Sequence, residues 1–409
     1  MTKKKLLVLA YEYYPTENAN TRIIRNTCER LADRYEADLV TVRTPGDTDR
    51  EEDKGKFRVI RVPAYSFHRG KCTGRVTPFV FGRMVTEKIR GKMTHDETRM
   101  LERLYEREIR RAVSTVSYDA IISFSAPFLP HGCASRLAGE TGIPWTAVCL
   151  DPYFSHRIFG PEGLEERKKR EETVMENAAR VLITYPTDRD YLRAGVAFRD
   201  KIRGIEMPGI VPRVQEPAGA GTGSGPVRCS FFGSMYREIR DPRQAIALFS
   251  AAGEGIEARF AGRIVDGTKE EFFPEGCPCR YLGELAGETL AGEYADAEVL
   301  VNIGNSVDNQ MPSKIFEYIS TGKPIINIFK SADCPTLKYL GRYPLVLNIH
   351  EAEIRKDPAG CVSRVQAFCR EHRGERVPAE ETKRLYAANT FEAFTESICR
   401  AIEGEEDKA

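Results

Sequence analysis

Apolar positions recur along the chain in two patterns, as short continuous runs and at every third or fourth position of longer stretches. The runs predict buried β-strands, and the longer stretches predict amphipathic helices. In the first half we expect strands at residues 4–14, 37–44, 57–64, 118–125, 143–151 and 180–185, and helices at residues 21–35, 83–116, 131–142, 165–179 and 187–195. Strands that alternate with helices in this way are typical of a parallel sheet covered by helices on both faces.

The same alternation resumes in the second half, after a segment at residues 212–226 that is rich in Gly, Pro, Ala and Ser. Such a composition indicates a flexible linker. Further strands are expected at residues 228–234, 257–262, 279–285 and 298–304, and further helices at residues 240–253, 287–297 and 382–404.

This pattern predicts an α/β protein of two Rossmann-like domains that face each other across a cleft. We expect the first domain at residues 1–211 and the second at residues 227–385. Residues 386–409 are expected to form a C-terminal helix that packs back on the first domain and ends in a frayed tail.

Residues 309–329 predict a loop, a short helix and a buried strand, with Gly322 just past the helix end. Ser313 and Lys314 lie at the expected helix start, and Glu317 follows one turn later. Free backbone N–H groups and a partial positive charge at a helix start favour phosphate, and a lysine there strengthens the site. A carboxylate one turn later suits sugar hydroxyls. We interpret this stretch as a nucleotide-sugar site.

Composition narrows the range of functions. A chain of 409 residues is too long for one ordinary core, and 41% apolar with 30% charged residues is typical of a globular protein. The net charge of +1 gives no argument for binding nucleic acid, and no apolar run is long enough for a transmembrane helix. Residues 1–15 resemble a signal peptide superficially, but the apolar run is short and no cleavage site follows, so we expect a first strand there.

The eleven cysteines are scattered, and the one closely spaced pair is Cys277 and Cys279. A structural zinc site needs about four ligands at recognisable spacing, and no partners lie near this pair. We therefore expect reduced structural thiols in a cytoplasmic protein.

Polar residues follow several predicted strands, at the sheet edge where open α/β sheets bind ligands. Asn20 and Arg22 follow the first strand, but without the glycine pattern of a dinucleotide or P-loop site. His131 and Asp151 follow later strands of the first half. Both also fit structural roles, as a packing or capping histidine and as a turn-capping aspartate. In a site, the carboxylate of Asp151 could hold an acceptor hydroxyl.

In the second half, Gly233 ends a predicted strand, and Arg237 and Arg240 follow it. Glycine would let the backbone approach a ligand closely, and the two arginines could clamp a diphosphate by bidentate hydrogen bonds. A solvated loop explains this segment equally well when it is taken alone. The phosphate interpretation is favoured because Lys314 follows another strand of the same half.

These motifs resemble those of the GT-B glycosyltransferases, close to family 4 and its polysaccharide-assembly members. The resemblance covers nearly the whole chain. It includes residues 118–154, which begin YDAIISFSAP and end CLDPYF, and FFGSMYREIRDP at residues 231–242. The most specific match is PSKIFEYISTGKPII at residues 312–326.

The resemblance implies transfer of a sugar from a nucleotide-diphosphate sugar to a glycan or lipid-linked acceptor, with retention of anomeric configuration. It places the donor on Gly233, Arg237, Arg240, Asn309, Ser313, Lys314 and Glu317, and the phosphate or acceptor loop on Asn20 and Arg22. It makes Arg240, Lys314, Asp151 and His131 the catalytic candidates. No Asp-x-Asp motif lies near the donor half, so we expect no metal and no cofactor.

Family members often carry two glutamates separated by seven residues. Glu317 takes the second place, but the first is Asn309, a neutral amide, which affects the expected handling of the donor sugar ring. Two alternatives remain beside the transferase: a sugar-nucleotide epimerase of the same fold, and a non-catalytic glycosyltransferase-like partner subunit, which the change at Asn309 favours.

Residues 61–111 carry about two basic residues for each acidic one, with phenylalanines between them. A solvated charged helix accounts for this pattern. The alternative is a patch that contacts anionic lipid and presents a lipid-linked acceptor, which would place the protein at the inner face of the membrane.

Overall fold

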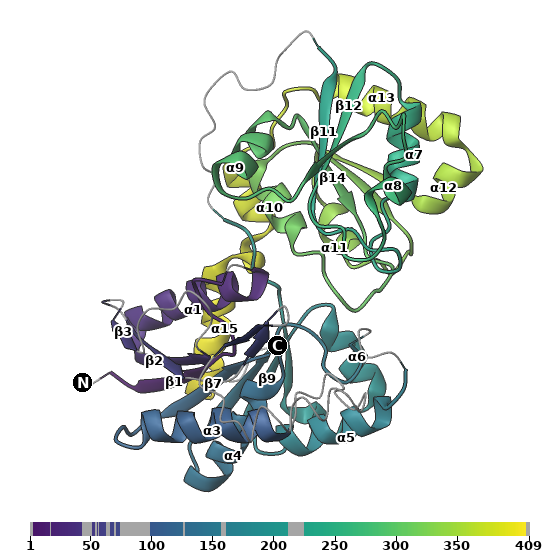
Figure 1. Ribbon diagram of the computed structural model, residues 1–409. Coiled ribbons are helices and arrows are strands. Elements are labelled where there is room, and N and C mark those ends of the chain that lie inside the picture. The colour runs from purple at the N-terminus through teal and green to yellow at the C-terminus, as the bar shows by residue number, and fades with distance from the viewer. Residues whose placement is uncertain are drawn as a thin grey trace. The chain divides into compact units, whose positions relative to one another are not determined.

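The computed structural model describes residues 3–16, 18–42, 51–53, 55, 57–62, 66–68, 71–73, 99–125, 127–156, 161–211 and 225–405 (Figure 1). The chain divides into two compact units. The N-terminal domain comprises Met1–Pro208 together with Phe391–Ala409, and the C-terminal domain comprises Gly209–Thr390. Each domain is described by itself.

The N-terminal domain contains one parallel sheet with an antiparallel edge strand. Its strand order is β10-β9-β8-β7-β1-β2-β4-β3, and β3 is the antiparallel strand. The strands are β1 (Lys5–Leu9), β2 (Glu36–Val42), β3 (Glu51–Asp53), β4 (Arg58–Val62), β7 (Ala120–Phe124), β8 (Trp145–Cys149), β9 (Arg180–Thr184) and β10 (Ile202–Ile205). A separate antiparallel pair comprises β5 (Ser66–His68) and β6 (Lys71–Thr73).

Helices cover both faces of this sheet. They are α1 (Ala19–Arg34), α3 (Arg99–Val113), α4 (Leu129–Thr141), α5 (Leu164–Met175), α6 (Thr187–Ala194), the short 3₁₀ helix η2 (Arg199–Lys201) and α15 (Phe391–Glu403). Helices α1 and α15 lie on one face, and α3, α4 and α5 lie on the other (Figure 1). None of the helices in the described part of the chain is long and apolar enough to cross a membrane.

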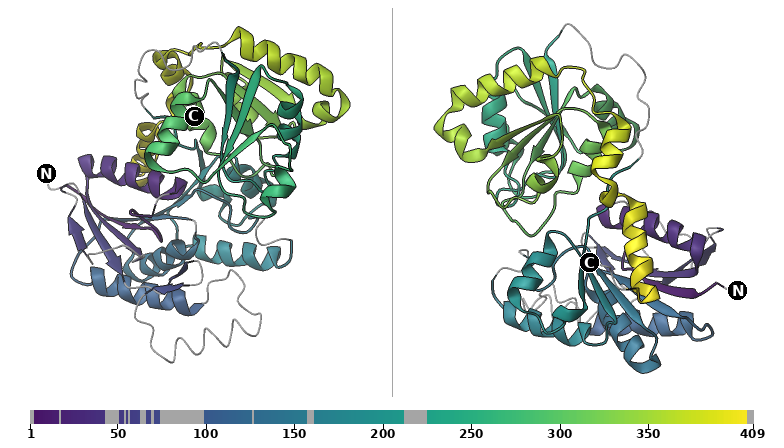
Figure 2. Two further views of the ribbon diagram at one scale, coloured as in Figure 1. Left: turned by 45° about the horizontal axis from the view of Figure 1, so that its top comes forward. Right: turned by 180° about the vertical axis from the view of Figure 1, so that it is seen from behind.

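The last helix belongs to the N-terminal domain although it is the end of the chain. Viewed from behind, α15 runs beside α1 (Figure 2). Arg34 of α1 pairs with Glu396 of α15 at 2.7 Å, and Arg30 pairs with Glu392. The predicted helical region at residues 382–404 is therefore interrupted: its first part lies in the C-terminal domain, and the chain enters the N-terminal domain at Phe391.

The C-terminal domain is a six-stranded, wholly parallel sheet with strand order β13-β12-β11-β14-β15-β16. The strands are β11 (Val227–Phe232), β12 (Ile256–Ala261), β13 (Arg280–Gly283), β14 (Val299–Ile303), β15 (Ile325–Phe329) and β16 (Val346–His350). The helices are α7 (Arg243–Ala251), α8 (Lys269–Phe272), α9 (Gly287–Asp296), α10 (Lys314–Thr321), α11 (Thr336–Leu340), α12 (Glu351–Lys356), α13 (Pro358–Glu371), α14 (Ala379–Leu385) and the 3₁₀ helix η3 (Ala387–Asn389).

The strand order of each domain reverses once. In the N-terminal domain the chain runs outward from β1 and then returns to place β7 on the other side of β1. In the C-terminal domain β11 and β14 have the same relation. Open α/β sheets bind ligands outside the carboxyl ends of the strands at such switch points.

The predicted local elements agree with the structure in most places. The expected apolar face of α1 is buried at Ile23, Ile24, Cys28 and Leu31. Gly322 ends α10 in the left-handed conformation, with φ of 73°, as expected of the residue past a helix end. Of the helix predicted at residues 83–116, the structure describes residues 99–116, and α3 occupies Arg99–Val113 of these. The linker predicted at residues 212–226 lies almost wholly outside the described residues.

Candidate functional site

The switch point of the C-terminal domain is bordered by the segments that follow β11 and β14. Gly233 comes directly after β11, and a Cβ atom added to it would lie 3.3 Å from Nη1 of Arg240. Gly262, which follows β12, approaches the same turn: a Cβ atom there would lie 2.1 Å from the carbonyl oxygen of Gly233. The backbone of Gly233 is therefore packed between Arg240 and the β12 turn, a packing that depends on glycine at position 262.

The guanidinium of Arg240 is held by an amide. Its Nε and Nη2 both donate to Oδ1 of Asn305, at 3.1 and 2.8 Å. Asn305 follows β14, so this contact joins the two segments that border the switch point. Burial lowers the pKa of Arg240, but arginine stays charged at any physiological pH. Among the described residues no carboxylate pairs with this side chain.

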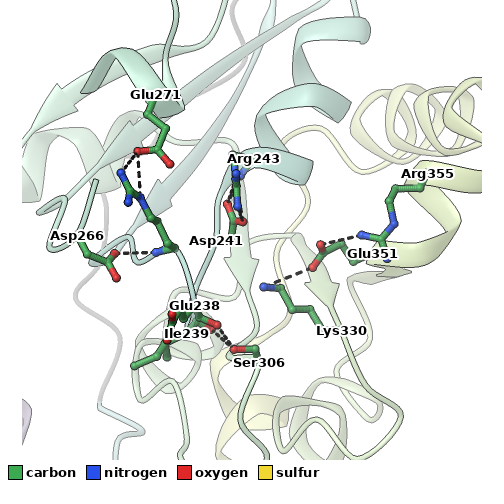
Figure 3. Close-up of polar contacts among 11 residues, drawn as sticks. Glu238, Ile239, Asp241, Arg243, Asp266, Glu271, Ser306, Lys330, Glu351 and Arg355 are labelled. Atoms are coloured by element: carbon green, nitrogen blue, oxygen red, sulfur yellow. Dashed lines mark hydrogen bonds and ion pairs between the residues drawn. The ribbon is translucent and has the colours of Figure 1, made fainter. Parts of the chain in front are cut away.

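Two other arginines near this edge of the sheet are paired with acids (Figure 3). Nε of Arg237 donates to Glu271 at 3.0 Å, and its backbone N–H donates to Asp266 at 2.7 Å. Arg243 forms a bidentate pair with Asp241. The structure thus brings Arg240 next to Gly233, whereas it directs Arg237 toward the β12 side of the loop.

The start of α10 carries a second charged group. Nζ of Lys314 lies 3.0 Å from Oε2 of Glu317, and the hydroxyl of Tyr294 donates to the same oxygen at 3.3 Å. The ammonium also lies 5.6 Å from the centre of the Tyr294 ring, within range of a cation–π interaction. Ser313 is the N-cap residue of α10. The structure therefore pairs Lys314 with Glu317 at the start of α10, and α9 contributes Tyr294.

Asn309 lies in the loop between β14 and α10 and is buried, with 7% of its surface exposed. Asn305 lies in the same loop, and its Nδ2 donates to the carbonyl oxygen of Gln310 at 3.2 Å. The amide at position 309 is thus part of a packed loop that leads from Asn305 to Lys314.

In the N-terminal domain the structure brings together Asn20 and Asp151. The side chain of Asn20, at the start of α1, is hydrogen bonded to the carboxyl of Asp151, which follows β8. Burial raises the pKa of Asp151, while the nearby His156 and the Asn20 hydrogen bond act in the opposite direction. Arg22 lies two residues after Asn20 in α1 and is half-buried. Its backbone N–H donates to the Asn18 carbonyl, within a helix start that is closed by an Asn18–Thr21 capping box.

His131 has the surroundings of a core residue. It has no exposed surface, and its Nδ1 lies 2.6 Å from Oγ of Ser123. Because Nε1 of Trp145 donates to that same oxygen at 2.7 Å, the serine hydroxyl is free to donate to the imidazole. Nε2 then faces Sγ of Cys149 at 3.6 Å. Burial lowers the pKa of His131 to about 3, so the ring is neutral. This environment leads us to revise the expectation of an acceptor-side role for His131.

The loop that carries Asp151 is anchored by a buried acid that the sequence did not single out. Oε2 of Glu171 accepts from the backbone N–H of Phe154 at 3.1 Å, and Oε1 accepts from the hydroxyl of Tyr191 at 2.6 Å. That hydroxyl also accepts from the N–H of Tyr153 at 3.2 Å. Burial raises the pKa of Glu171 to about 8.

Sequence reasoning missed Asn305, Tyr294 and Glu171. Asn305 directly follows a predicted strand, and this position was the one available signal. Within the described ranges, no three His, Cys, Asp or Glu side chains are grouped so that they could hold a metal ion. The described cysteines are all free thiols.

The N-terminal half of the chain resembles a known protein family. Residues 20–206 match the family model described as a glycosyl transferase 4-like domain. No curated protein matches the chain.

Solved structures resemble the chain over nearly its full length. Sucrose-phosphate synthase from Thermosynechococcus elongatus has a TM-score of 0.62 at 15% identity, covering 98% of this chain and 99% of that one. Trehalose 6-phosphate synthase from Burkholderia multivorans has a TM-score of 0.60 at 10% identity, covering 99% and 97%. WaaG, a glycosyltransferase involved in lipopolysaccharide biosynthesis, has a TM-score of 0.58 at 14% identity, covering 98% and 100%.

At these identities the solved structures establish the fold, and the family model shows that residues 20–206 are similar to a glycosyl transferase 4-like domain. The resemblance drawn from the sequence motifs is thereby confirmed. The chain has the two-domain fold of the GT-B glycosyltransferases, and its residues 20–206 are similar to a glycosyl transferase 4-like domain.

Proposed function

We propose that the protein transfers a sugar from a nucleotide-diphosphate sugar to a glycan or lipid-linked acceptor. One observation carries this proposal beyond the family match: at the C-terminal switch point, Arg240 is held by the neutral amide of Asn305 rather than by a carboxylate. Its charge is therefore not compensated by a described acid. A fixed guanidinium at a ligand-binding edge suits the diphosphate of a sugar donor.

The reaction forms one bond and breaks another. The acceptor hydroxyl oxygen attacks the anomeric carbon of the donor sugar while the bond from that carbon to the β-phosphate oxygen breaks. The hydroxyl proton passes to the departing phosphate oxygen on the same face, which gives retention of configuration. Arg240 would stabilise the charge that develops on the departing diphosphate, and such electrostatic stabilisation is usually the largest catalytic contribution.

Within this proposal we assign roles to three further predicted residues. Lys314 lies at the start of α10, where a helix start and an ammonium favour phosphate or sugar. Glu317 would bind ribose hydroxyls, and Asp151 would hold the acceptor hydroxyl. We assign His131 a structural role because its ring is wholly buried and neutral. The reaction as proposed uses no cofactor and no metal.

Peripheral membrane contact gains no support from the described part of residues 61–111. On α3, Arg110 pairs with Glu106 at 2.7 Å and also with Glu140. The remainder of that segment lies largely outside the described residues, so we do not include membrane contact in the proposal.

The test is to incubate the protein with UDP-, GDP-, ADP- and TDP-sugars and to measure nucleotide release with and without a lipid-linked acceptor. We expect release from one donor class that increases when the acceptor is present. Nucleotide release from no donor, together with no thermal shift by any nucleotide, would contradict the proposal. A thermal shift without release would favour the non-catalytic subunit, and a changed sugar on an intact nucleotide would favour the epimerase.

A further inference from the structure

The contact between Arg240 and Asn305 is unusual among the charged contacts at this edge of the C-terminal sheet. Both donor atoms of Arg240 converge on a single neutral oxygen, at 3.1 and 2.8 Å. By contrast, Arg237, Arg243 and Lys314 each have a carboxylate partner. The amide orients the guanidinium without cancelling its charge.

Asn305 is itself fixed in place. It is 7% exposed, and its Nδ2 donates to the Gln310 carbonyl oxygen at 3.2 Å. This second bond sets the orientation of the amide, because Nδ2 must point toward Gln310 and Oδ1 must therefore point toward Arg240. A donor on one side and an acceptor on the other are both used here, and the amide supplies the two without a net charge.

The neighbouring residue secures the same loop from its backbone. The N–H of Ser306 donates to the Ile239 carbonyl at 2.7 Å, and its hydroxyl donates to the carbonyl of Glu238 (Figure 3). The segment after β14 thus holds residues 238–240 through the backbone as well as through the arginine side chain. Arg240 is fixed before any ligand arrives, which removes the entropic cost of ordering a long side chain during binding.

We infer that Asn305 is a positioning residue of the nucleotide-sugar site, which orients Arg240 toward the donor diphosphate and leaves its positive charge available. This inference rests on the proposed function. It predicts that a carboxylate at this position would be harmful although it has nearly the same shape. A carboxylate would pair with the guanidinium and offset the charge that the diphosphate needs.

The experiment compares Asn305→Asp with Asn305→Ala, using UDP, GDP, ADP and TDP as probes in titration calorimetry at several salt concentrations. For the nucleotide that the wild-type protein binds best, we expect Asn305→Asp to weaken affinity on the order of 10- to 100-fold, which corresponds to loss of a charge-assisted hydrogen bond. Asn305→Ala keeps the charge of Arg240 but not its orientation, and we expect a smaller loss. The salt dependence of binding should weaken in Asn305→Asp and persist in Asn305→Ala.

The matched control is Asn348→Asp in β16, which adds the same charge to the same domain at an amide that accepts from Asn327 at 2.7 Å. It should bind nucleotide as the wild type does. In an Arg240→Gln background, Asn305→Asp should have little further effect on nucleotide affinity, because the guanidinium that the new carboxylate would pair with is absent. Thermal unfolding should show that Asn305→Asp is at least as stable as Asn305→Ala.

Two results separate this inference from the proposed function. If the wild-type protein binds nucleotide and Asn305→Asp binds it equally well, or if its effect is unchanged in the Arg240→Gln background, the role of Asn305 is wrong while the transferase proposal stands. If the wild-type protein binds none of the four nucleotides at millimolar concentration and no sugar nucleotide either, both fail.

Discussion

The polar side chains near the two switch points differ in their partners. In the N-terminal domain, Ser123 is hydrogen bonded to both His131 and Trp145 inside the core, and Glu171 accepts a hydrogen bond from the loop after β8. In the C-terminal domain, Arg240 at the β11–β14 switch point is held by Asn305 with its charge uncompensated among described residues. Position after a strand end is the same in both cases. The two groups differ in the chemistry of their partners, which is a hydroxyl inside the core for His131 and a neutral amide for Arg240.

The largest expected effect comes from removing the charge at the C-terminal switch point. Arg240→Gln should lower kcat/KM for the donor by about 10²- to 10³-fold, comparable to loss of one preorganised donor to a developing negative charge. Arg240→Lys keeps the charge but loses the bidentate geometry, so it should fall between this variant and the wild type. Steady-state kinetics with the donor class found by nucleotide release would measure both. Wild-type activity of Arg240→Gln would show that the charge of Arg240 does not serve the donor.

On the N-terminal side, substitution of the buried histidine should affect stability rather than chemistry. His131→Ala removes the partner of Ser123 and leaves a cavity, so the free energy of unfolding should fall by about 2–4 kcal/mol. Activity per folded molecule should stay within about threefold of wild type, since the neutral ring is enclosed in the core. Urea unfolding and kinetics at low temperature measure the two quantities. A hundredfold loss of kcat in a stably folded variant would restore a catalytic role for His131.

The buried acid of the N-terminal domain should make stability depend on pH. Burial raises the pKa of Glu171 from 4.5 to about 8, so between these values the folded state keeps a proton that the unfolded state releases. Stability should therefore decrease as pH rises through this range, by at most about 1.4 kcal/mol per pH unit for this group. Glu171→Gln keeps the shape and should remove that contribution.

Urea unfolding of both proteins at pH 5.5, 6.5, 7.5 and 8.5 tests this expectation. The stability of Glu171→Gln relative to the wild type should rise with pH. A constant difference between the two proteins would show that Glu171 does not titrate in this range.

The smallest effect should come from an arginine that already has an acid partner. The side chain of Arg237 is 52% exposed and pairs with Glu271. Exposed pairs of this kind contribute about 0–1 kcal/mol, so Arg237→Ala should change stability and donor affinity only slightly. Thermal unfolding and nucleotide titration measure this. A loss of donor affinity as large as that of Arg240→Gln would mean that Arg237 exchanges its acid partner for the ligand.

Local structure followed closely from the sequence where periodicity was strong. The apolar face of α1, the end of α10 at Gly322 and the buried strand β15 were all expected. Edge elements were harder to predict: β16 was not anticipated, because only Ile349 of its five residues is buried and its apolar pattern is correspondingly short. The antiparallel strand β3 and the edge strand β10 were missed as well.

For the candidate site, the sequence identified the residues at strand ends but not their partners. Arg240 and Lys314 could be named from their positions. Asn305 could not, because it meets Arg240 across 65 residues of sequence only through the pairing of β11 with β14. Tyr294 reaches Glu317 from a different helix in the same way.

The sequence by itself determined the alternation of strands and helices in most of the chain and the two Rossmann-like domains, because these depend on local periodicity and on the topology of parallel sheets. Only the tertiary structure decided which polar residues are enclosed and which keep an uncompensated charge. Electrostatic and hydrogen-bond interactions depend on distances of about 3 Å between atoms of distant segments, and no local pattern encodes those distances. His131 and Arg240 both follow strands, yet their partners give them different roles.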